Sequence, residues 1–292
     1  MSTLNTRPEW LKMKAPDSDV LDKMERMFQN LSLHTVCESA ICPNIGKCFK
    51  SGTATFMIMG GTCTRNCRFC AVTKGIPSAL DENEPENVAL ASKKLGLRHI
   101  VVTSVTRDDL EDGGAEHFVK TVKQLRKYNP NSTVELLIPD LKGNWSALKK
   151  IVECKPDIIN HNIETVSCLY SKVRPMAVYK RSIELLHQVK SMDNSIYTKC
   201  GIMVGLGESE EQVVEVMDDL IKVNCDILTI GQYLRPSKRH LPVKEYITPE
   251  IFKKYKTIAL KKGFKFAASG PYVRSSYQAS IGIDTVKRYG SN

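Results

Sequence analysis

Short apolar runs rich in β-branched residues alternate with helical patterns along most of this chain. The runs are ATFMIM at 54, HIVVTS at 99, TVELLI at 133, DIINHNI at 157, YTKCGIMV at 197 and DILTIG at 226. Helical periodicity follows them at 86–95, 115–127, 145–153, 180–190, 210–223 and 249–262. Because such alternation joins parallel strands through crossover helices, the sequence predicts an α/β fold on a parallel sheet.

The pattern supplies six β/α units, fewer than the eight of a closed barrel. We therefore predict a partial (β/α)6 TIM-like barrel with N-terminal and C-terminal extensions. Residues 1–52 would carry a helix over SDVLDKMERMFQN and a cysteine-rich loop, 53–270 the barrel, and 271–292 a C-terminal segment. Ser209 and Gln212 form a capping-box pattern at the start of one predicted helix.

Charge is distributed unevenly over the 292 residues. The net charge is +10, and the segment from Gly231 to the end holds 13 Lys and Arg against three Asp and Glu. Such a basic segment suits nucleic acid, an anionic membrane or an acidic protein. The chain has no apolar run long enough to span a bilayer and no signal-peptide core at its start, so we expect a cytoplasmic protein. Ten cysteines in such a protein favour metal or redox chemistry over disulfides.

Three of these cysteines lie within the eight residues of CTRNCRFC, directly after the first predicted strand. Cys63, Cys67 and Cys70 would therefore lie at the carboxyl end of the sheet, where β/α barrels collect their chemistry. Zinc sites use paired spacings and four ligands, and no histidine or second pair lies nearby. Three thiolates in one loop instead suit three corners of a [4Fe–4S] cluster, which leaves one iron open to a small molecule. Chance core cysteines are the weaker alternative.

The remaining cysteines fall into two groups. Cys37, Cys42 and Cys48 form a second triad in CESAICPNIGKCF, which taken alone suits either zinc or an iron–sulfur cluster. The isolated cysteines are expected to be small core residues; they are Cys154, Cys168, Cys200 and Cys225.

The CX3CX2C spacing after the first strand resembles the radical S-adenosylmethionine superfamily. That resemblance implies that the open iron binds S-adenosylmethionine, and that one electron splits it into methionine and a 5′-deoxyadenosyl radical. A radical suits an unactivated C–H bond, because no side-chain base can deprotonate such a carbon. Within the superfamily, the chain resembles the lipoyl synthases over almost its whole length beyond the first thirty residues. The motifs that carry this resemblance are the Cys37–Cys48 triad, GGTCTRNCRFC, VTSVTRDDLEDGGAEHF, INHNIETV, IMVGLGE, IGQYLRPS and SGPYVRSSY.

The resemblance to the lipoyl synthases implies a reaction and a set of cluster ligands. The reaction is the insertion of two sulfur atoms at C6 and C8 of a protein-bound octanoyl-lysine, with two S-adenosylmethionine consumed. One [4Fe–4S] cluster would be held by Cys63, Cys67 and Cys70. An auxiliary [4Fe–4S] cluster, the sulfur donor, would be held by Cys37, Cys42, Cys48 and Ser276 of the RSSY motif.

The same resemblance implies partners. The substrate would be an octanoylated lipoyl carrier domain or a glycine cleavage H-type protein, and the electron donor a protein such as ferredoxin or flavodoxin. Neither nucleic acid nor a membrane is expected to take part.

Five residues are candidates for contacts with S-adenosylmethionine: Phe69, Ser104, Asn162, Glu164 and Arg174. We expect Asn162 and Glu164 at the ribose, although strand-end hydrogen bonding is an alternative, and Arg174 at the carboxylate unless it is a surface arginine. Phe69 would lie along the adenine. TSVTRDD replaces the GGE that many superfamily members have after the second strand, which leaves Ser104 and backbone carbonyls for the amino group. His161 is expected to be a hydrogen-bonded core histidine.

Two other functions fit parts of the sequence. A tRNA methylthiotransferase would use the basic segment, with its tyrosines, to hold RNA. The chain lacks room for an added RNA-binding domain, and the RSSY ending argues against this function. A zinc-binding interaction protein without catalysis would use the two cysteine triads.

Overall fold

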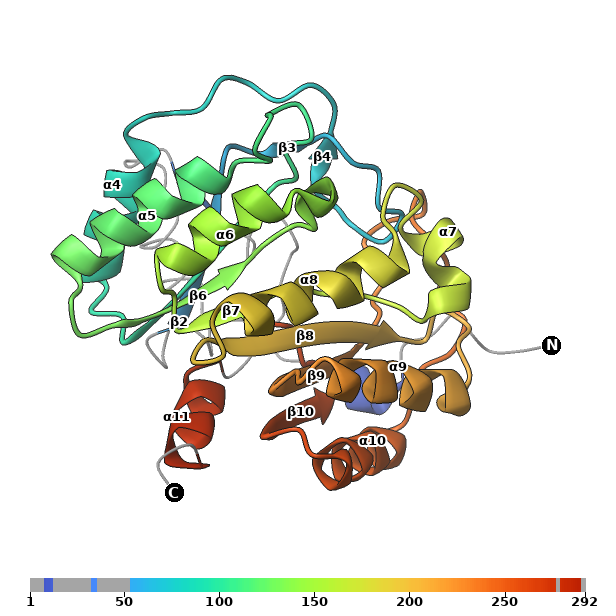
Figure 1. The fold of residues 1–292 in the computed structure, drawn as a ribbon. Coiled ribbons are helices and arrows are strands. Elements are labelled where there is room, and N and C mark those ends of the chain that lie inside the picture. Colours follow the sequence, from blue (N-terminus) through green and yellow to red (C-terminus); the bar gives the residue numbers. More distant parts are fainter. Residues whose placement is uncertain (1–7, 13–32, 36–52, 277–278, 290–292) are drawn as a thin grey trace.

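The structure is a computed structural model that describes residues 8–12, 33–35, 53–276 and 279–289 (Figure 1). The predicted N-terminal helix and the triad of Cys37, Cys42 and Cys48 lie outside the described residues.

The described part of the chain is built on one eight-stranded sheet. Its order is β1 (His34–Thr35), β2 (Thr53–Ile58), β5 (His99–Ser104), β6 (Thr133–Leu137), β7 (Ile158–Asn160), β8 (Tyr197–Val204), β9 (Ile227–Gln232) and β10 (Phe266–Gly270). Strands β2 to β10 are parallel, and β1 is antiparallel to β2. Among the described residues, β1 and β10 are the two edges and do not pair, so the sheet is an open, partial barrel as predicted.

The six predicted strands are β2 and β5 to β9, and all six are confirmed. The structure adds β1 and a seventh parallel strand, β10, which the sequence did not predict. The β10 sequence, FAASG, contains no β-branched residue, so it lacks the composition that marks a strand.

Helices cover one face of the sheet (Figure 1). The six predicted helices are confirmed as α4 (Glu84–Lys94), α5 (Ala115–Tyr128), α6 (Trp145–Glu153), α8 (Tyr179–Met192), α9 (Glu210–Lys222) and α10 (Pro249–Lys262). The described chain adds α7 (Tyr170–Val173), α11 (Ala279–Tyr289) and the 3-10 turns η1 (Glu9–Leu11), η2 (Leu141–Gly143) and η3 (Ser167–Leu169). The predicted capping box begins α9, with Ser209 Oγ accepting from Gln212 N and Gln212 Oε1 accepting from Ser209 N.

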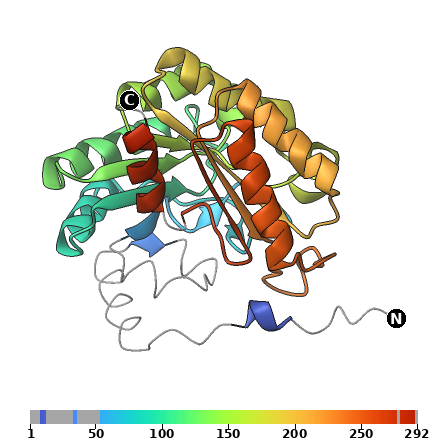
Figure 2. The same ribbon diagram turned by 90° about the horizontal axis from the view of Figure 1, so that it is seen from below.

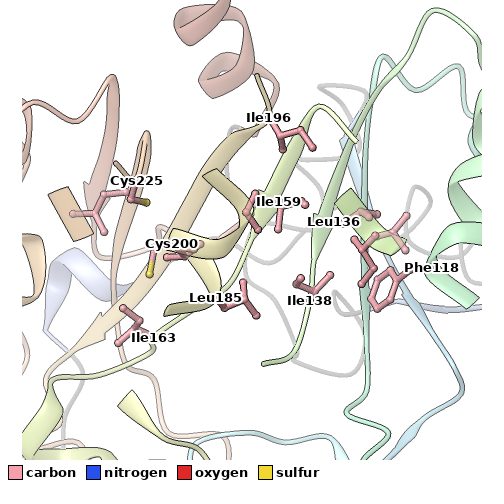
Figure 3. Close-up of a cluster of buried hydrophobic side chains, with 14 of the residues drawn as sticks. Phe118, Leu136, Ile138, Ile159, Ile163, Leu185, Ile196, Cys200 and Cys225 are labelled. Carbon is pink, nitrogen blue, oxygen red and sulfur yellow. The ribbon is translucent and has the colours of Figure 1, made fainter. Parts of the chain in front are cut away.

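The main core lies between the sheet and these helices. Figure 3 shows Leu136 of β6 and Ile159 of β7 among the side chains that meet Phe118 of α5 and Leu185 of α8. Removing this apolar surface from water stabilises the fold by roughly 25 cal/mol per Å².

The isolated cysteines only partly match the expectation that they are core residues. Cys200 and Cys225 are buried in the main core, whereas Cys154 is half-buried. Cys168 is exposed, so the prediction for this residue was wrong. It lies in η3, a single turn that buries none of its residues.

The other face of the sheet has its own cover near the amino ends of the strands. Ile283 and Val286 of α11 pack against Ile158 and Ile227, the first residues of β7 and β9. In Figure 2, α11 lies inside the arc of the other helices. This contact covers the face opposite the main helices at the amino ends of the strands. The carboxyl ends of the strands on the same face are left open to a ligand.

A buried charged layer lies beside that cover, since Glu135 is the register partner of Ile158 and Lys199 that of Ile227. Lys199 of β8 places Nζ 2.9 and 3.0 Å from the two carboxylate oxygens of Glu135 on β6, and His99 lies 3.3 Å from the same carboxylate. Burial opposes ionisation of Glu135, but Lys199 and His99 outweigh it and hold its pKa at about 2. Because side chains alternate along a strand, Leu137 and Gly201, two residues further on, share this face at the next level.

Candidate active site

CTRNCRFC lies at the carboxyl end of β2, as the sequence predicts. Here we call residues 60–75 the cysteine loop. It contains β3 (Thr62–Cys63) and β4 (Thr73–Lys74), which pair in parallel and bracket the motif. Cys63, Cys67 and Cys70 line a cavity of about 590 Å³ whose inner wall includes Leu137 and Gly201. The cavity therefore opens above the charged layer of the sheet.

The three thiols sit in different surroundings. Cys63 Sγ accepts hydrogen bonds from the backbone N–H groups of Thr106 (3.3 Å) and Arg65 (3.4 Å). Burial raises the pKa of Cys70 to about 11 and also raises that of Cys67, where the nearby Arg174 opposes it. Metal binding would therefore release protons, because the ligand is the thiolate.

In the described part of the chain, no three His, Cys, Asp or Glu side chains converge closely enough to hold one metal ion. In an iron–sulfur cluster each cysteine binds a different iron.

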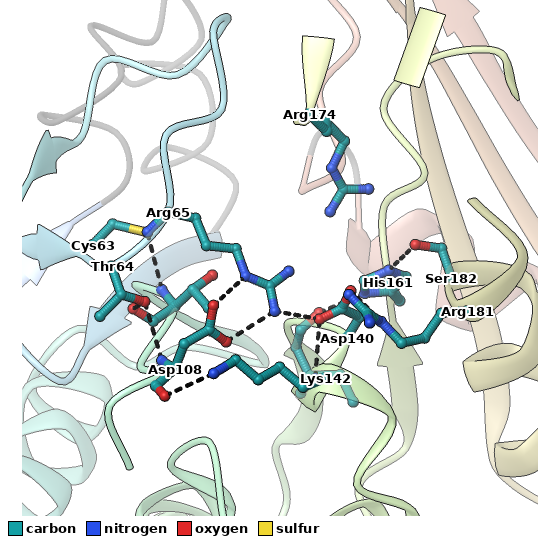
Figure 4. Close-up of polar contacts among 12 residues, drawn as sticks. Cys63, Thr64, Arg65, Asp108, Asp140, Lys142, His161, Arg174, Arg181 and Ser182 are labelled. Atoms are coloured by element: carbon teal, nitrogen blue, oxygen red, sulfur yellow. Dashed lines mark hydrogen bonds and ion pairs between the residues drawn. The ribbon is translucent and has the colours of Figure 1, made fainter. Parts of the chain in front are cut away.

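A buried ion network fixes the cysteine loop from below (Figure 4). Arg65 donates from Nε and Nη2 to both oxygens of Asp108, at 2.7 and 2.9 Å, and from Nη2 to Asp140 Oδ1 at 2.5 Å. Arg181 of α8 holds the other oxygen of Asp140 at 2.8 Å. Burial opposes ionisation of Asp140, yet Arg65 and Arg181 hold its pKa far below the usual range. The network joins the cysteine loop to the segments after β5 and β6.

Arg174 is not a surface arginine. Its side chain is buried, and its Nη1 donates to the carbonyls of Asn162 (2.8 Å) and Ile163 (3.1 Å). Its Nε, Asn162 Oδ1 and Ser104 Oγ are buried and have no hydrogen-bond partner among the described residues. Since buried polar groups are nearly always paired, these three unpaired atoms among the residues that line the cavity mark a place for a polar ligand. A ligand with amino, carboxylate and hydroxyl groups, such as S-adenosylmethionine, fits these atoms.

Asn162 and Glu164 both line the cavity and meet just beyond the end of β7. Asn162 Nδ2 donates to Glu164 Oε1 at 3.1 Å, and burial raises the pKa of Glu164. Gly201 makes room for this pair, because a Cβ there would lie 2.6 Å from Asn162 Oδ1.

His161 is the hydrogen-bonded core histidine that the sequence predicts. Its Nδ1 lies 2.8 Å from the Ile138 carbonyl and its Nε2 lies 2.9 Å from Ser182 Oγ. Burial lowers its pKa to about 4, aided by the charge of Arg174.

Phe69 lies in the cysteine loop and lines the cavity. It packs against a small apolar cluster of Val173, Leu206, Tyr233 and Leu241. Its ring is therefore held beside the cysteines.

The C-terminal segment reaches the same cavity. Arg274 and Ser275 line it, and Ser276 follows directly, half-buried, with its carbonyl accepting from Ala279 N at 3.3 Å. The close approach depends on Gly231 of β9, where a Cβ would lie 2.1 Å from the Val273 carbonyl oxygen.

Sequence reasoning missed the residues that hold the cysteine loop in place. Arg65 and Asp108 stand in the CTRNCRFC and TSVTRDD motifs, so a charged residue inside each motif was the available signal. Asp140, which contacts Arg65, and His240, which lies 3.0 Å from the Cys70 carbonyl, lie in ordinary loop sequence. Their sequence therefore gave no signal of this role. None of the helices in the described ranges combines the length and apolarity that a membrane span requires.

Comparison with known proteins agrees with this geometry. Residues 57–220 match the family described as the Radical SAM superfamily. Solved structures with the same fold include SuiB of Streptococcus suis bound to its precursor peptide (TM-score 0.58, 13% identity, 92% of this chain and 58% of SuiB). Methylornithine synthase, PylB, is a second (TM-score 0.53, 13% identity, 88% of this chain and 87% of PylB).

Two curated relatives match at much higher identity. A lipoyl synthase of Caldanaerobacter subterraneus subsp. tengcongensis is 60% identical over 96% of this chain and 98% of its own length. A lipoyl synthase of Alkaliphilus metalliredigens is 53% identical over 96% of this chain and 97% of its own length. With its cysteine triad on the wall of a partial barrel, the chain belongs to the lipoyl synthase family of radical S-adenosylmethionine enzymes.

Proposed function

We propose that this enzyme inserts two sulfur atoms, at C6 and C8, into an octanoyl chain attached to a lysine of a carrier protein. The observation that carries the proposal is a juxtaposition. The cysteine triad of CTRNCRFC and the RSSY segment, about 200 residues apart in sequence, reach one cavity at the carboxyl end of the sheet. Family membership supplies the reaction class.

Several of the cavity residues would hold the radical source. Cys63, Cys67 and Cys70 hold a [4Fe–4S] cluster, which together with S-adenosylmethionine supplies a radical that removes hydrogen from unactivated carbons. The buried Arg174 guanidinium provides positive charge for the methionine carboxylate.

The polar and aromatic residues orient the rest of S-adenosylmethionine. Asn162 and Glu164 accept from the ribose hydroxyls, and Ser104 is an acceptor for the amino group. Phe69 presents its ring to the adenine. The apolar part of the wall, including Met57 and Leu137, excludes water from the reacting carbons.

The sulfur comes from an auxiliary [4Fe–4S] cluster that acts as a substrate and is consumed. Its ligands are Cys37, Cys42, Cys48 and Ser276. Serine oxygen suits iron in a sulfide cage less well than thiolate does, so Ser276 would be the weakest of the four ligands. Among the described residues, the cysteines that line the cavity are the three of CTRNCRFC.

The substrate is an octanoylated lipoyl carrier domain or a glycine cleavage H-type protein. Its acyl chain enters the cavity between the cysteine loop and the C-terminal segment. A ferredoxin or flavodoxin supplies the electrons, and no nucleic acid is involved.

Labelled sulfide tests the proposal. The protein is reconstituted anaerobically with iron and isotopically labelled sulfide, and a single turnover is run on an octanoylated carrier domain. We expect label at both C6 and C8, and about eight irons per chain before turnover for two four-iron clusters. Unlabelled product, or stoichiometric zinc without sulfide, would overturn the proposal.

A further inference from the structure

The segment that follows β9 packs directly onto the cysteine loop. Residues 233–244 are called the basic loop here. His240 Nε2 lies 3.0 Å from the Cys70 carbonyl oxygen, and Leu241 N donates to the Arg68 carbonyl at 3.2 Å. Tyr233 and Leu241 also pack beside Phe69. The basic loop therefore touches the backbone of a cysteine that we assign to the radical cluster.

Internal hydrogen bonds give the basic loop a defined shape. Arg235 donates from Nε to the His240 carbonyl (2.9 Å) and from Nη2 to the Lys238 carbonyl. Ser237 Oγ lies 2.9 Å from His240 Nδ1, and Tyr233 OH donates to the Leu241 carbonyl at 2.8 Å. A loop ordered in this way loses little conformational freedom when a partner binds.

The basic loop carries exposed cations without an acidic partner among the described residues. Lys238, Arg239 and Lys244 are exposed, as is Arg68 of the cysteine loop, and none forms an ion pair with any residue that the structure describes. Residues 231–244 contain no Asp or Glu.

Three cations elsewhere in the C-terminal part of the chain have acidic partners. Lys254 pairs with Glu210 at 2.6 Å, Lys265 pairs with Asp226 at 2.7 Å, and Lys262 pairs with Asp218. Lys253, Lys256 and Lys261 on the surface of α10 form no ion pair with a described residue either. The basic-loop cations differ from these in their position beside the cysteine loop.

We propose that Arg68, Lys238 and Arg239 form the docking surface for an acidic protein that donates one electron to the cluster. A donor must bring its own cofactor close to the irons held by the cysteine triad, and this surface lies over the Cys70 backbone. In the transfer one electron leaves the donor and enters the cluster, and no bond forms or breaks. The inference rests on the radical cluster of the proposed function and not on sulfur insertion.

Charge reversal tests this surface. The double variant Lys238→Glu/Arg239→Glu is compared with Lys253→Glu/Lys256→Glu, which makes the same change in net charge at two exposed lysines of α10. Cluster reduction is followed by visible absorbance and by electron paramagnetic resonance, with reduced flavodoxin as one donor and dithionite as the other. Iron content and the melting temperature are measured for every variant.

We expect flavodoxin to reduce the basic-loop variant at least tenfold more slowly than the α10 variant at low salt, since electrostatic steering changes association rates by about 10 to 10³. The difference should shrink as salt screens the charges. Dithionite should reduce both variants at similar rates. Lys238→Gln/Arg239→Gln, a milder change, should give an intermediate rate with flavodoxin.

Two outcomes would overturn the proposal. One is equal reduction of the two double variants by flavodoxin. The other is unchanged reduction accompanied by loss of affinity for the octanoylated carrier domain, which would make this surface the carrier's. Unlabelled product in the sulfide experiment would leave the reduction assay unaffected, so the two failures are distinguishable.

Discussion

The Arg65 guanidinium and the Asp140 carboxylate, 75 residues apart in the sequence, meet at 2.5 Å in a buried site under the cysteine loop. Arg65 stands between two cysteines, and Asp140 begins the turn that follows β6. The pair therefore couples the position of the loop to the frame of the barrel.

Replacing Arg65 should loosen the cysteine loop. In Arg65→Gln, Asp108 loses both of its bonds to the guanidinium, and breaking a buried ion pair costs about 3–5 kcal/mol. We expect a lower urea midpoint and faster loss of iron from the reconstituted protein during gel filtration. Arg65→Lys keeps the positive charge but not the two-pronged guanidinium. It should therefore recover part of the urea midpoint and part of the iron retention.

The exposed Arg98 offers a matched control for that substitution. Arg98→Gln should leave the urea midpoint and the iron retention unchanged. If Arg65→Gln behaves like Arg98→Gln, the ion network does not hold the loop.

Removing the cysteine triad should abolish cleavage of S-adenosylmethionine. The variant Cys63→Ala/Cys67→Ala/Cys70→Ala has no ligands for the radical cluster, so we expect no 5′-deoxyadenosine and about four irons per chain from the auxiliary cluster. Cys168→Ala removes an exposed thiol outside the cavity and should have no effect. Normal 5′-deoxyadenosine formation by the triple variant would refute the assignment.

His161 should make the fold less stable in mild acid. Burial lowers its pKa to about 4 in the folded protein, against about 6.5 for an ordinary histidine. Between these values the unfolded chain binds the proton and the folded chain does not. The contribution of His161 is thus complete above pH 6.5 and is lost as the pH falls towards 4, by up to about 1.4 kcal/mol per pH unit.

Urea unfolding at several pH values measures this slope. His161→Gln keeps a donor for the Ile138 carbonyl but cannot titrate, so its free energy of unfolding should fall less between pH 6.5 and 4 than that of the unaltered protein. An equal slope in the two proteins would assign the acid sensitivity to other groups.

The sequence predicted the barrel because its signals are local. Each strand from β2 to β9 in the main sheet carries its own apolar run, and each crossover helix its own periodicity. The small residues of β10 carry no such signal. This strand is identified only in the structure, where it pairs in parallel with β9. Cys168 was misplaced because its neighbours Val166 and Leu169 pack against the core while Cys168 itself is exposed in the single turn η3.

The candidate site divides in the same way. Motif residues such as Asn162 and Arg174 could be named in advance, and the structure brings them to one cavity. The partners of Arg65 could not, because a contact between residues 75 positions apart leaves no pattern in a single sequence. Likewise, only the fold shows that the basic excess separates into paired and unpaired cations.

Ser276 should matter for sulfur insertion and not for radical formation. Ser276→Ala removes the proposed oxygen ligand of the auxiliary cluster, so we expect lipoyl product to fall at least tenfold while dithionite-driven cleavage of S-adenosylmethionine stays measurable. Ser275→Ala changes the adjacent hydroxyl, which lines the cavity, and should retain most of the product. Normal product from Ser276→Ala would remove Ser276 from the site.

Gly231 should control the position of the RSSY segment. A Cβ at this position would lie 2.1 Å from the Val273 carbonyl oxygen and 3.1 Å from its carbon, and these are backbone atoms that cannot rotate away. In Gly231→Ala the segment that carries Ser276 must move off β9, at a cost of about 1–3 kcal/mol for overpacking. We expect lipoyl formation to fall at least tenfold, with S-adenosylmethionine cleavage reduced much less.

Gly282 of α11 provides the control for this substitution. A Cβ there would meet only the Phe266 ring, at 3.5 and 3.6 Å, which is ordinary contact, and alanine favours a helix more than glycine does. Gly282→Ala should therefore keep both activities. Product formation, S-adenosylmethionine cleavage and iron content are measured in parallel for the two variants. If Gly231→Ala makes as much lipoyl product as Gly282→Ala, close packing of Val273 on β9 is not what positions Ser276.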